Sequence, residues 1–159
     1  PVFIRGLRAL AAELRRGAAS ACSRQFDPAV LAQARLAPDM LTLAGQVQRA
    51  SDTSKLSAER LSGVPAPKFP DTETTMDELQ DRVKATIAYL HHLKPESFHD
   101  SASKTLSLPQ LGETRGDVYL LEFGLPNFYF HIATVHAILR HNGVPVGKMD
   151  YLGSASESK

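Results

Sequence analysis

The sequence of 159 residues contains a single cysteine, Cys22. One cysteine excludes an internal disulfide framework and any zinc site built from several cysteines. The sequence also lacks an uninterrupted apolar run of the roughly 18 residues that a membrane span needs. It opens on Pro1 and Val2 without a hydrophobic signal region. We therefore expect a cytoplasmic protein with no membrane anchor.

Neither positive nor negative charge is in clear excess in this sequence. Lysine and arginine number 18 against 17 aspartate and glutamate residues, which leaves +1 with neutral histidines. A chain that binds nucleic-acid phosphates needs a clear cationic face, so nucleic-acid binding is not expected. Phosphate-binding glycine loops, a serine nucleophile elbow and the His-Glu-x-x-His motif are also missing from the sequence. Hydrophobic residues make up 43%, enough for the core of one domain.

Four segments repeat apolar residues at spacings of three and four, as amphipathic helices do. The third is preceded by a Thr-x-x-Glu capping box formed by Thr75 and Glu78. Asn142-Gly143 supplies a stop for the fourth. The predicted helices run from about Val2 to Ser23, Pro38 to Leu61, Met76 to Leu93, and Pro126 or one turn earlier to His141.

The helical period vanishes between Pro95 and Glu122. Residues 104–108 and 117–121 are β-prone, with turn residues between them, which allows a small hairpin. We therefore predict an all-α, up-and-down four-helix bundle with a short irregular or β-hairpin insertion before the last helix. Residues 1–153 form one domain in this prediction. Residues 144–153 pack back on the bundle, and 154–159 form a mobile tail.

The fourth helix is apolar on two sides. Phe128, Ile132 and Val135 form its core face, whereas Phe130 and Ala133 lie nearly opposite. A helix that is apolar on two sides is either central or at an interface. We expect a homodimer through this helix, with the first helix as a further candidate for the interface.

His131 shares the inward face of that helix. A buried imidazole needs partners for two nitrogens, so it is either a core histidine or a functional one. As a core residue it would bond Gln46, Asp39 or a backbone carbonyl, with Gln46 preferred. As a functional residue it would be a metal ligand or a general base. A metal pair would place a second histidine at i+4, but that position is Val135.

Two other polar residues are less clear. His136 points about 140° away from His131 around the wheel, at roughly 100° per residue, and needs a different partner. Asp39 could cap the helix predicted from Pro38, or extend a polar stripe through Gln46 and Thr53 toward a cleft.

Several strings resemble a family of unassigned function found in bacteria and fungi. This family is similar to the DinB/YfiT-like superfamily of four-helix bundles, and the resemblance spans nearly the whole chain. The strings that carry it are Leu36–Met40, Gln46–Asp52, Asp71–Thr75, Leu125–His131, Ile138–Pro145 and Gly147–Gly153.

The resemblance implies a homodimeric bundle, in a superfamily where many members bind a divalent metal through three histidines. Those members place one histidine on the second helix and two, four residues apart, on the last. Here the matching positions hold Gln46, His131 and Val135. His131 is thus the one candidate ligand of an incomplete set. A divalent metal is not favoured, and a remodelled pocket between the second and fourth helices is expected.

These observations lead to one functional expectation and one alternative. The chain binds, and could transform, a small molecule in a cleft near His131, which serves as base or ligand. The alternative is a non-catalytic homodimeric binding or regulatory module without metal. The predicted ligand-binding residues are Asp39, Gln46, Asn127, Phe128 and Tyr129.

Overall fold

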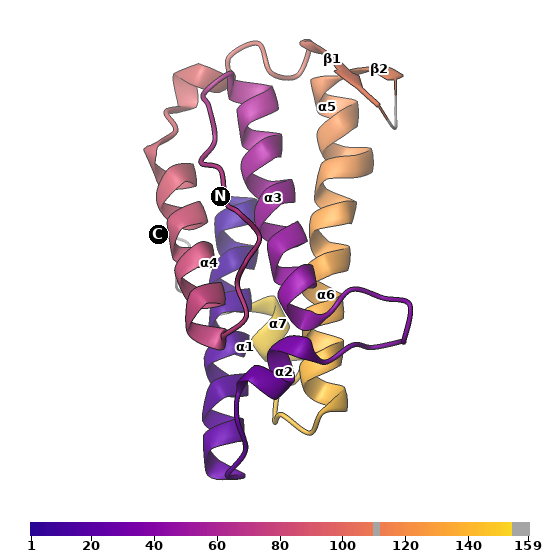
Figure 1. Ribbon diagram of the computed structural model, residues 1–159. Coiled ribbons are helices and arrows are strands. Elements are labelled where there is room, and N and C mark those ends of the chain that lie inside the picture. Colours follow the sequence, from indigo (N-terminus) through magenta and orange to yellow (C-terminus); the bar gives the residue numbers. More distant parts are fainter. Residues whose placement is uncertain (110–111, 154–159) are drawn as a thin grey trace.

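The computed structural model describes residues 1–109 and 112–153. Its four long helices run side by side in one bundle (Figure 1). Contacts pair α1 with α4, α4 with α3, α3 with α6 and α6 with α1, which closes a ring around a common core. The predicted helical bundle with a hairpin before the last helix is therefore confirmed. These helices are α1 (Val2–Ser23), α3 (Leu43–Ser62), α4 (Met76–His92) and α6 (Leu125–His141).

The helices α1 and α4 begin where local signals in the sequence place them. Leu7, Leu10 and Leu14 recur along α1 and are fully buried, because their spacing puts them on one inward stripe. At the start of α4, the Thr75 hydroxyl accepts a hydrogen bond from the backbone N–H of Glu78. The Glu78 carboxylate accepts one from the backbone N–H of Thr75 in return. The predicted capping box is present.

The helix α3 begins at Leu43 rather than at Pro38, which corrects the predicted boundary. An antiparallel bridge between Arg35 and Thr42 folds the chain back, so the segment between them is a loop. The side chain of Thr42 accepts a hydrogen bond from the N–H of Gly45 at 3.1 Å and caps the helix. Asp39 lies in the exposed loop and neither caps α3 nor extends its polar stripe.

The hairpin consists of β1 (Thr105–Leu108) paired antiparallel with β2 (Gly112–Arg115). The β-prone segment 117–121 is helical, so the second strand was predicted too late. The chain continues through α5 (Gly116–Val118) and the π-helical η2 (Tyr119–Gly124) into α6. Tyr119 is 1% exposed, and its hydroxyl lies 2.9 Å from both Ser57 Oγ and an Arg60 guanidinium nitrogen on α3. This burial overrides the local preference for strand.

Short elements complete the fold. They are α2 (Ala29–Gln33), the 3-10 helix η1 (Pro95–Phe98) and α7 (Lys148–Leu152). After α6, Val144 and Val146 enter the core and α7 packs on α1 and α6, as predicted for this segment. The predicted tail, 154–159, lies outside the described residues. Of the helices in the described ranges, none combines the length and apolarity of a membrane span.

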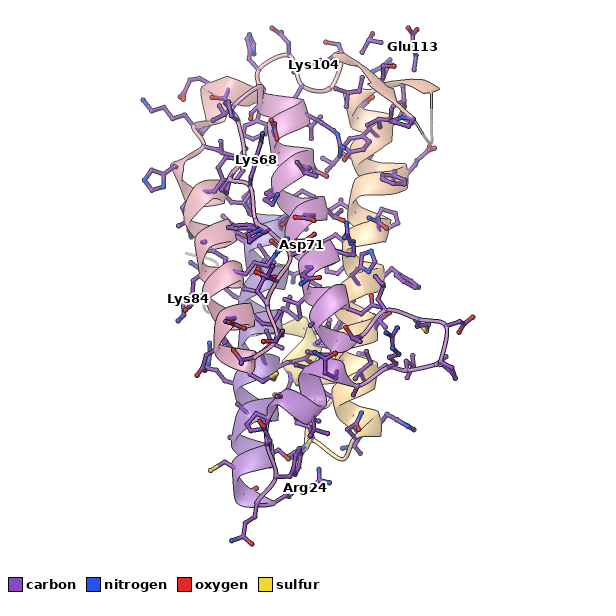
Figure 2. The ribbon with its side chains drawn as sticks, in the orientation of Figure 1. Arg24, Lys68, Asp71, Lys84, Lys104 and Glu113 are labelled. Carbon is purple, nitrogen blue, oxygen red and sulfur yellow. The ribbon has the colours of Figure 1, made fainter. Side chains whose placement is uncertain are left out.

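A buried arginine fastens the loop between α3 and α4. Arg82, whose side chain is 1% exposed, donates hydrogen bonds to Asp52 of α3 at 2.7 Å and to Asp71 and Glu73 of the loop at 2.6 and 3.0 Å. Figure 2 shows Asp71 on the loop segment that crosses the face of the bundle, whereas Lys84 points out from α4. Asp52 therefore serves this network rather than the face that α3 shares with α6.

Candidate functional site

His131 lies half-buried on α6 and is bonded to Gln46 on α3. Its Nδ1 is 2.7 Å from Oε1 of Gln46, a side chain that is only 2% exposed. The other end of that amide is held as well, because Nε2 of Gln46 donates to the carbonyl of Leu41 at 3.4 Å. The hydrogen bond predicted between Gln46 and His131 is present.

This orientation of the amide assigns the tautomer of His131. Oε1 of Gln46 can only accept, so Nδ1 of His131 carries the proton and donates it. Nε2 of the neutral ring is then left with a lone pair. In the described residues the buried polar atoms without a partner are Oε2 of Glu13 and Nε of Arg82. Nε2 of His131 has no hydrogen-bond partner among the described residues either. Because it is not one of these buried atoms, it is accessible to solvent.

Two effects keep His131 neutral. Burial lowers the pKa of its imidazole below the ordinary value because the charged form loses hydration, and the positive charge of Arg49 lowers the pKa further. Arg49 is three positions after Gln46 on α3 and so lies on the same side of that helix. The imidazole is therefore available as a hydrogen-bond acceptor or base at neutral pH.

The other four predicted site residues fall into four environments. Asn127 donates to Thr53 Oγ1 at 2.8 Å, a second bond between α6 and α3 on the side of His131. Phe128 is fully buried, with its ring edge-to-face against Phe3 at 4.9 Å between centroids. Tyr129 is half-buried near the guanidinium of Arg5, 3.5 Å from its hydroxyl. Phe128 thus belongs to the core, and Asp39 is separated from these residues in its loop.

The residues present do not fit a three-histidine metal site. Of the matching positions, Gln46 is already bonded at both ends and Val135 is a fully buried hydrocarbon. Across residues 1–109 and 112–153, no three side chains of histidine, cysteine, aspartate or glutamate gather closely enough to hold a metal ion. The chemistry available at His131 is that of the imidazole itself.

A second hydrogen-bonded pair joins His136, which was expected to need a partner of its own, to Glu13, which sequence reasoning missed. Nδ1 of His136 on α6 lies 2.6 Å from Oε1 of Glu13 on α1, and Glu13 is completely buried. Burial raises the pKa of Glu13, because its hydrogen bond and attraction to His136 offset only part of the lost hydration. The sequence does indicate such a pair. Glu13 lies on the apolar stripe of α1 between Leu10 and Gly17, where a buried acid requires a partner.

The pair lies beside α7. The ring of Tyr151 packs edge-on to His136 with 5.9 Å between centroids. Burial raises the pKa of the Tyr151 hydroxyl, with further contributions from Tyr129 and Glu13. Asp150 of the same short helix forms an ion pair with Arg16 at 2.9 Å. Polar contacts at this junction therefore join α1, α6 and α7.

Comparison with known proteins agrees with the geometry of the bundle. No curated protein matches the chain. The chain is similar to a solved structure described as a DinB family member protein from Shewanella denitrificans, with 41% sequence identity and a TM-score of 0.91. The match covers 96% of this chain and 88% of that one. Residues 1–152 match the family described as a domain of unknown function, DUF1993. The chain therefore belongs to the DUF1993 family and is a DinB-like helical protein.

Proposed function

We propose that this protein binds a small organic molecule on the face shared by α3 and α6, with Nε2 of His131 as the hydrogen-bond acceptor. The single observation that carries the proposal is the bond from Nδ1 of His131 to Oε1 of Gln46 at 2.7 Å. An imidazole held in this way presents one acceptor atom in a fixed direction. The ligand must therefore offer an O–H or N–H group.

The surroundings of His131 favour such a ligand. The exposed ring of Phe130 lies edge-on to the imidazole, 5.4 Å between centroids, and supplies an apolar surface beside the acceptor. Asn127, on the same helix and bonded to Thr53 of α3, adds a polar group near the face. Because the pKa of His131 is lowered, Nε2 is unprotonated at neutral pH and can take a proton from the bound group. His131 would then be the base, and Gln46 would orient it.

Ligand screening by NMR tests the proposal. A set of small phenols, alcohols and amides would be titrated into the protein while the imidazole signals of His131 are followed. Binding should move these signals, and His131→Ala should abolish the response. His141→Ala removes an exposed histidine from the last turn of the same helix and should have no effect. A response that survives in His131→Ala would refute the assignment.

A homodimer through α6 is the second candidate, because this helix carries apolar residues on its outer side. Phe130 is 56% exposed, and Ala133 and Ala137 follow it at i+3 and i+7 on one face. Light scattering of the size-separated protein should give twice the chain mass. Phe130→Asp should yield monomers, whereas Leu121→Asp, at a residue 64% exposed before α6, should leave the dimer intact. A monomeric wild type would rule out this candidate.

A further inference from the structure

The short helix α7 covers the part of α1 that contains Glu13. Ala9, Glu13 and Arg16 are separated by four and three residues, so they lie on one face of α1. Asp150 of α7 pairs with Arg16 at 2.9 Å, and Gly153, directly after α7, packs on Ala9. These two contacts flank Glu13 along α1, and Figure 1 shows α7, drawn in yellow, between α1 and α6. The helix α7 is therefore part of what buries this carboxyl.

Glu13 has one carboxyl oxygen without a hydrogen-bond partner. Its Oε1 lies 2.6 Å from Nδ1 of His136, whereas Oε2 is buried and accepts no hydrogen bond from any described residue. A protonated carboxyl carries no net charge. An ionised carboxyl would place negative charge on a buried oxygen that has no donor, which is unfavourable in the protein interior. The arrangement with α7 docked therefore favours the protonated form of Glu13.

The charged groups around Glu13 act in both directions. Burial, the largest effect, raises the pKa of Glu13, and the hydrogen bond to His136 lowers it. Asp150 raises this pKa through its negative charge, whereas Arg16 lowers it. The titratable and charged groups that face the Glu13–His136 pair are Arg5 and Arg16 of α1, Tyr129 of α6, and Asp150 and Tyr151 of α7. Asp150 is the acidic group of this set, and α7 brings it to Glu13.

The helix α7 depends on its docking for its helical structure. It has five residues, Lys148–Leu152, and isolated helices shorter than about 12 residues are marginal in water. Oδ2 of Asp150 accepts a hydrogen bond from the N–H of Gly147 at 2.8 Å and caps the helix, while Oδ1 of the same carboxylate pairs with Arg16. The ring of Tyr151 adds an edge-to-face contact with α6. Loss of these contacts would therefore also unfold α7.

We propose that α7 is a proton-sensitive latch, which stays docked while the carboxyl of Glu13 holds a proton and is released when Glu13 ionises. Release hydrates the carboxylate and separates it from the negative charge of Asp150. Val144 and Val146, just before α7, are buried in the core and limit the opening to the segment that follows them. The latch lies between α1, α6 and α7, so it goes beyond the function proposed for the α3–α6 face.

Release should be linked to one proton. Glu13 titrates at its ordinary value when α7 is released and higher when α7 is docked, so the docked state binds more protons between these two values. Rising pH in this window therefore favours release, by up to about tenfold in the opening equilibrium per pH unit. Amide hydrogen exchange measures the opening, because the N–H groups of Asp150, Tyr151 and Gly153 are hydrogen-bonded within the α7 segment. Their protection factors should fall from about pH 4.5 to 8, whereas that of Val144, bonded to α6, should stay constant.

Two pairs of variants test the latch. Glu13→Gln cannot ionise, so the protection of α7 should no longer depend on pH. Glu122→Gln, at an exposed acid of η2, should keep the wild-type dependence. Docking and ionisation are linked reciprocally. Tyr151→Ala, which weakens docking, should therefore bring the pKa of Glu13, read from its carboxyl ¹³C shift, toward the ordinary value. Met149→Ala, at a residue 72% exposed on the same helix, should leave this pKa unchanged.

The proposal is overturned if the protection of α7 does not change with pH, or changes equally in Glu13→Gln. A parallel loss of protection at Val144 would overturn it too, because the whole fold would then be opening. An unchanged pKa of Glu13 in Tyr151→Ala would show that α7 does not control the ionisation of this carboxyl, and that result would also contradict the latch.

Discussion

Gln46 of α3 and His131 of α6 are joined by a hydrogen bond of 2.7 Å between Oε1 and Nδ1. Because the Gln46 amide is also fixed by Leu41, the bond does more than satisfy a buried polar group. It assigns the proton of the imidazole to Nδ1 and leaves Nε2 as an acceptor. The proposed role of Nε2 as the acceptor for a ligand depends on this hydrogen bond.

The lowered pKa of His131 predicts how stability depends on pH. The unfolded ring titrates near 6.5, and the folded ring titrates lower because burial disfavours its charged form. Between these two values the unfolded state binds more protons, so stability should fall as the pH falls below about 6.5. His131→Gln should remove this part of the slope, and His141→Gln should retain it. Urea unfolding from pH 5 to 8 measures the effect; identical slopes in wild type and His131→Gln would contradict it.

Glu13 predicts a pH effect of opposite sign. Its pKa is raised by burial, so its contribution to stability is present below about pH 4.5 and is lost as the pH rises through the folded value. Glu13→Gln keeps an oxygen that can accept from Nδ1 of His136 but has no charge to bury. The variant should therefore gain stability relative to wild type as the pH rises above 4.5. Thermal unfolding at several pH values tests this expectation, which fails if the difference is constant or shrinks with pH.

Arg82 should be the most costly single charge to remove. Arg82→Met leaves Asp52 and Glu73, whose side chains are only 18% and 12% exposed, without their shared guanidinium. Breaking a buried charge network in this way costs about 3–5 kcal/mol. Lys84→Met breaks an exposed pair with Asp81 and should cost less than about 1 kcal/mol. Denaturant unfolding compares the two variants, and equal losses would show that the network contributes little.

The continuous helical segment that runs through α5, η2 and α6 begins at Gly116. A Cβ at this position would lie 1.9 Å from the carbonyl oxygen of Ser101, so Gly116→Ala should destabilise the protein by roughly 1–3 kcal/mol. Gly147→Ala meets nothing within 4 Å and should change stability by less than about 0.5 kcal/mol. Thermal or urea unfolding of both variants tests the prediction. A neutral Gly116→Ala would contradict the close approach of the Ser101 carbonyl to Gly116.

The bundle was predictable because its main signals are local. The apolar stripe of α1 and the capping box at Thr75 each lie within one segment, and both predicted starts match the structure. The start of α3 was misplaced because Pro38 imitates a helix start, whereas the real cap at Thr42 depends on the bridge to Arg35. The helical state of Tyr119 depends on Ser57 and Arg60, which are distant in the sequence.

The sites were predictable in part. His131 stood out because it is an inward histidine on an apolar helix. Gln46 stood out because, unlike Asp39, it had no capping role to account for its position. His136 was expected to need a partner of its own, but Glu13 was not considered, although an acid on the inner stripe of α1 requires a partner.

The protonation state of His131 at pH 7, read from imidazole nitrogen shifts in a long-range ¹H–¹⁵N spectrum, tests the proposed role of this residue most directly. We predict a neutral ring with the proton on Nδ1 and an unprotonated Nε2, and loss of this preference in Gln46→Leu. A charged ring, or a neutral ring with the proton on Nε2, would contradict it.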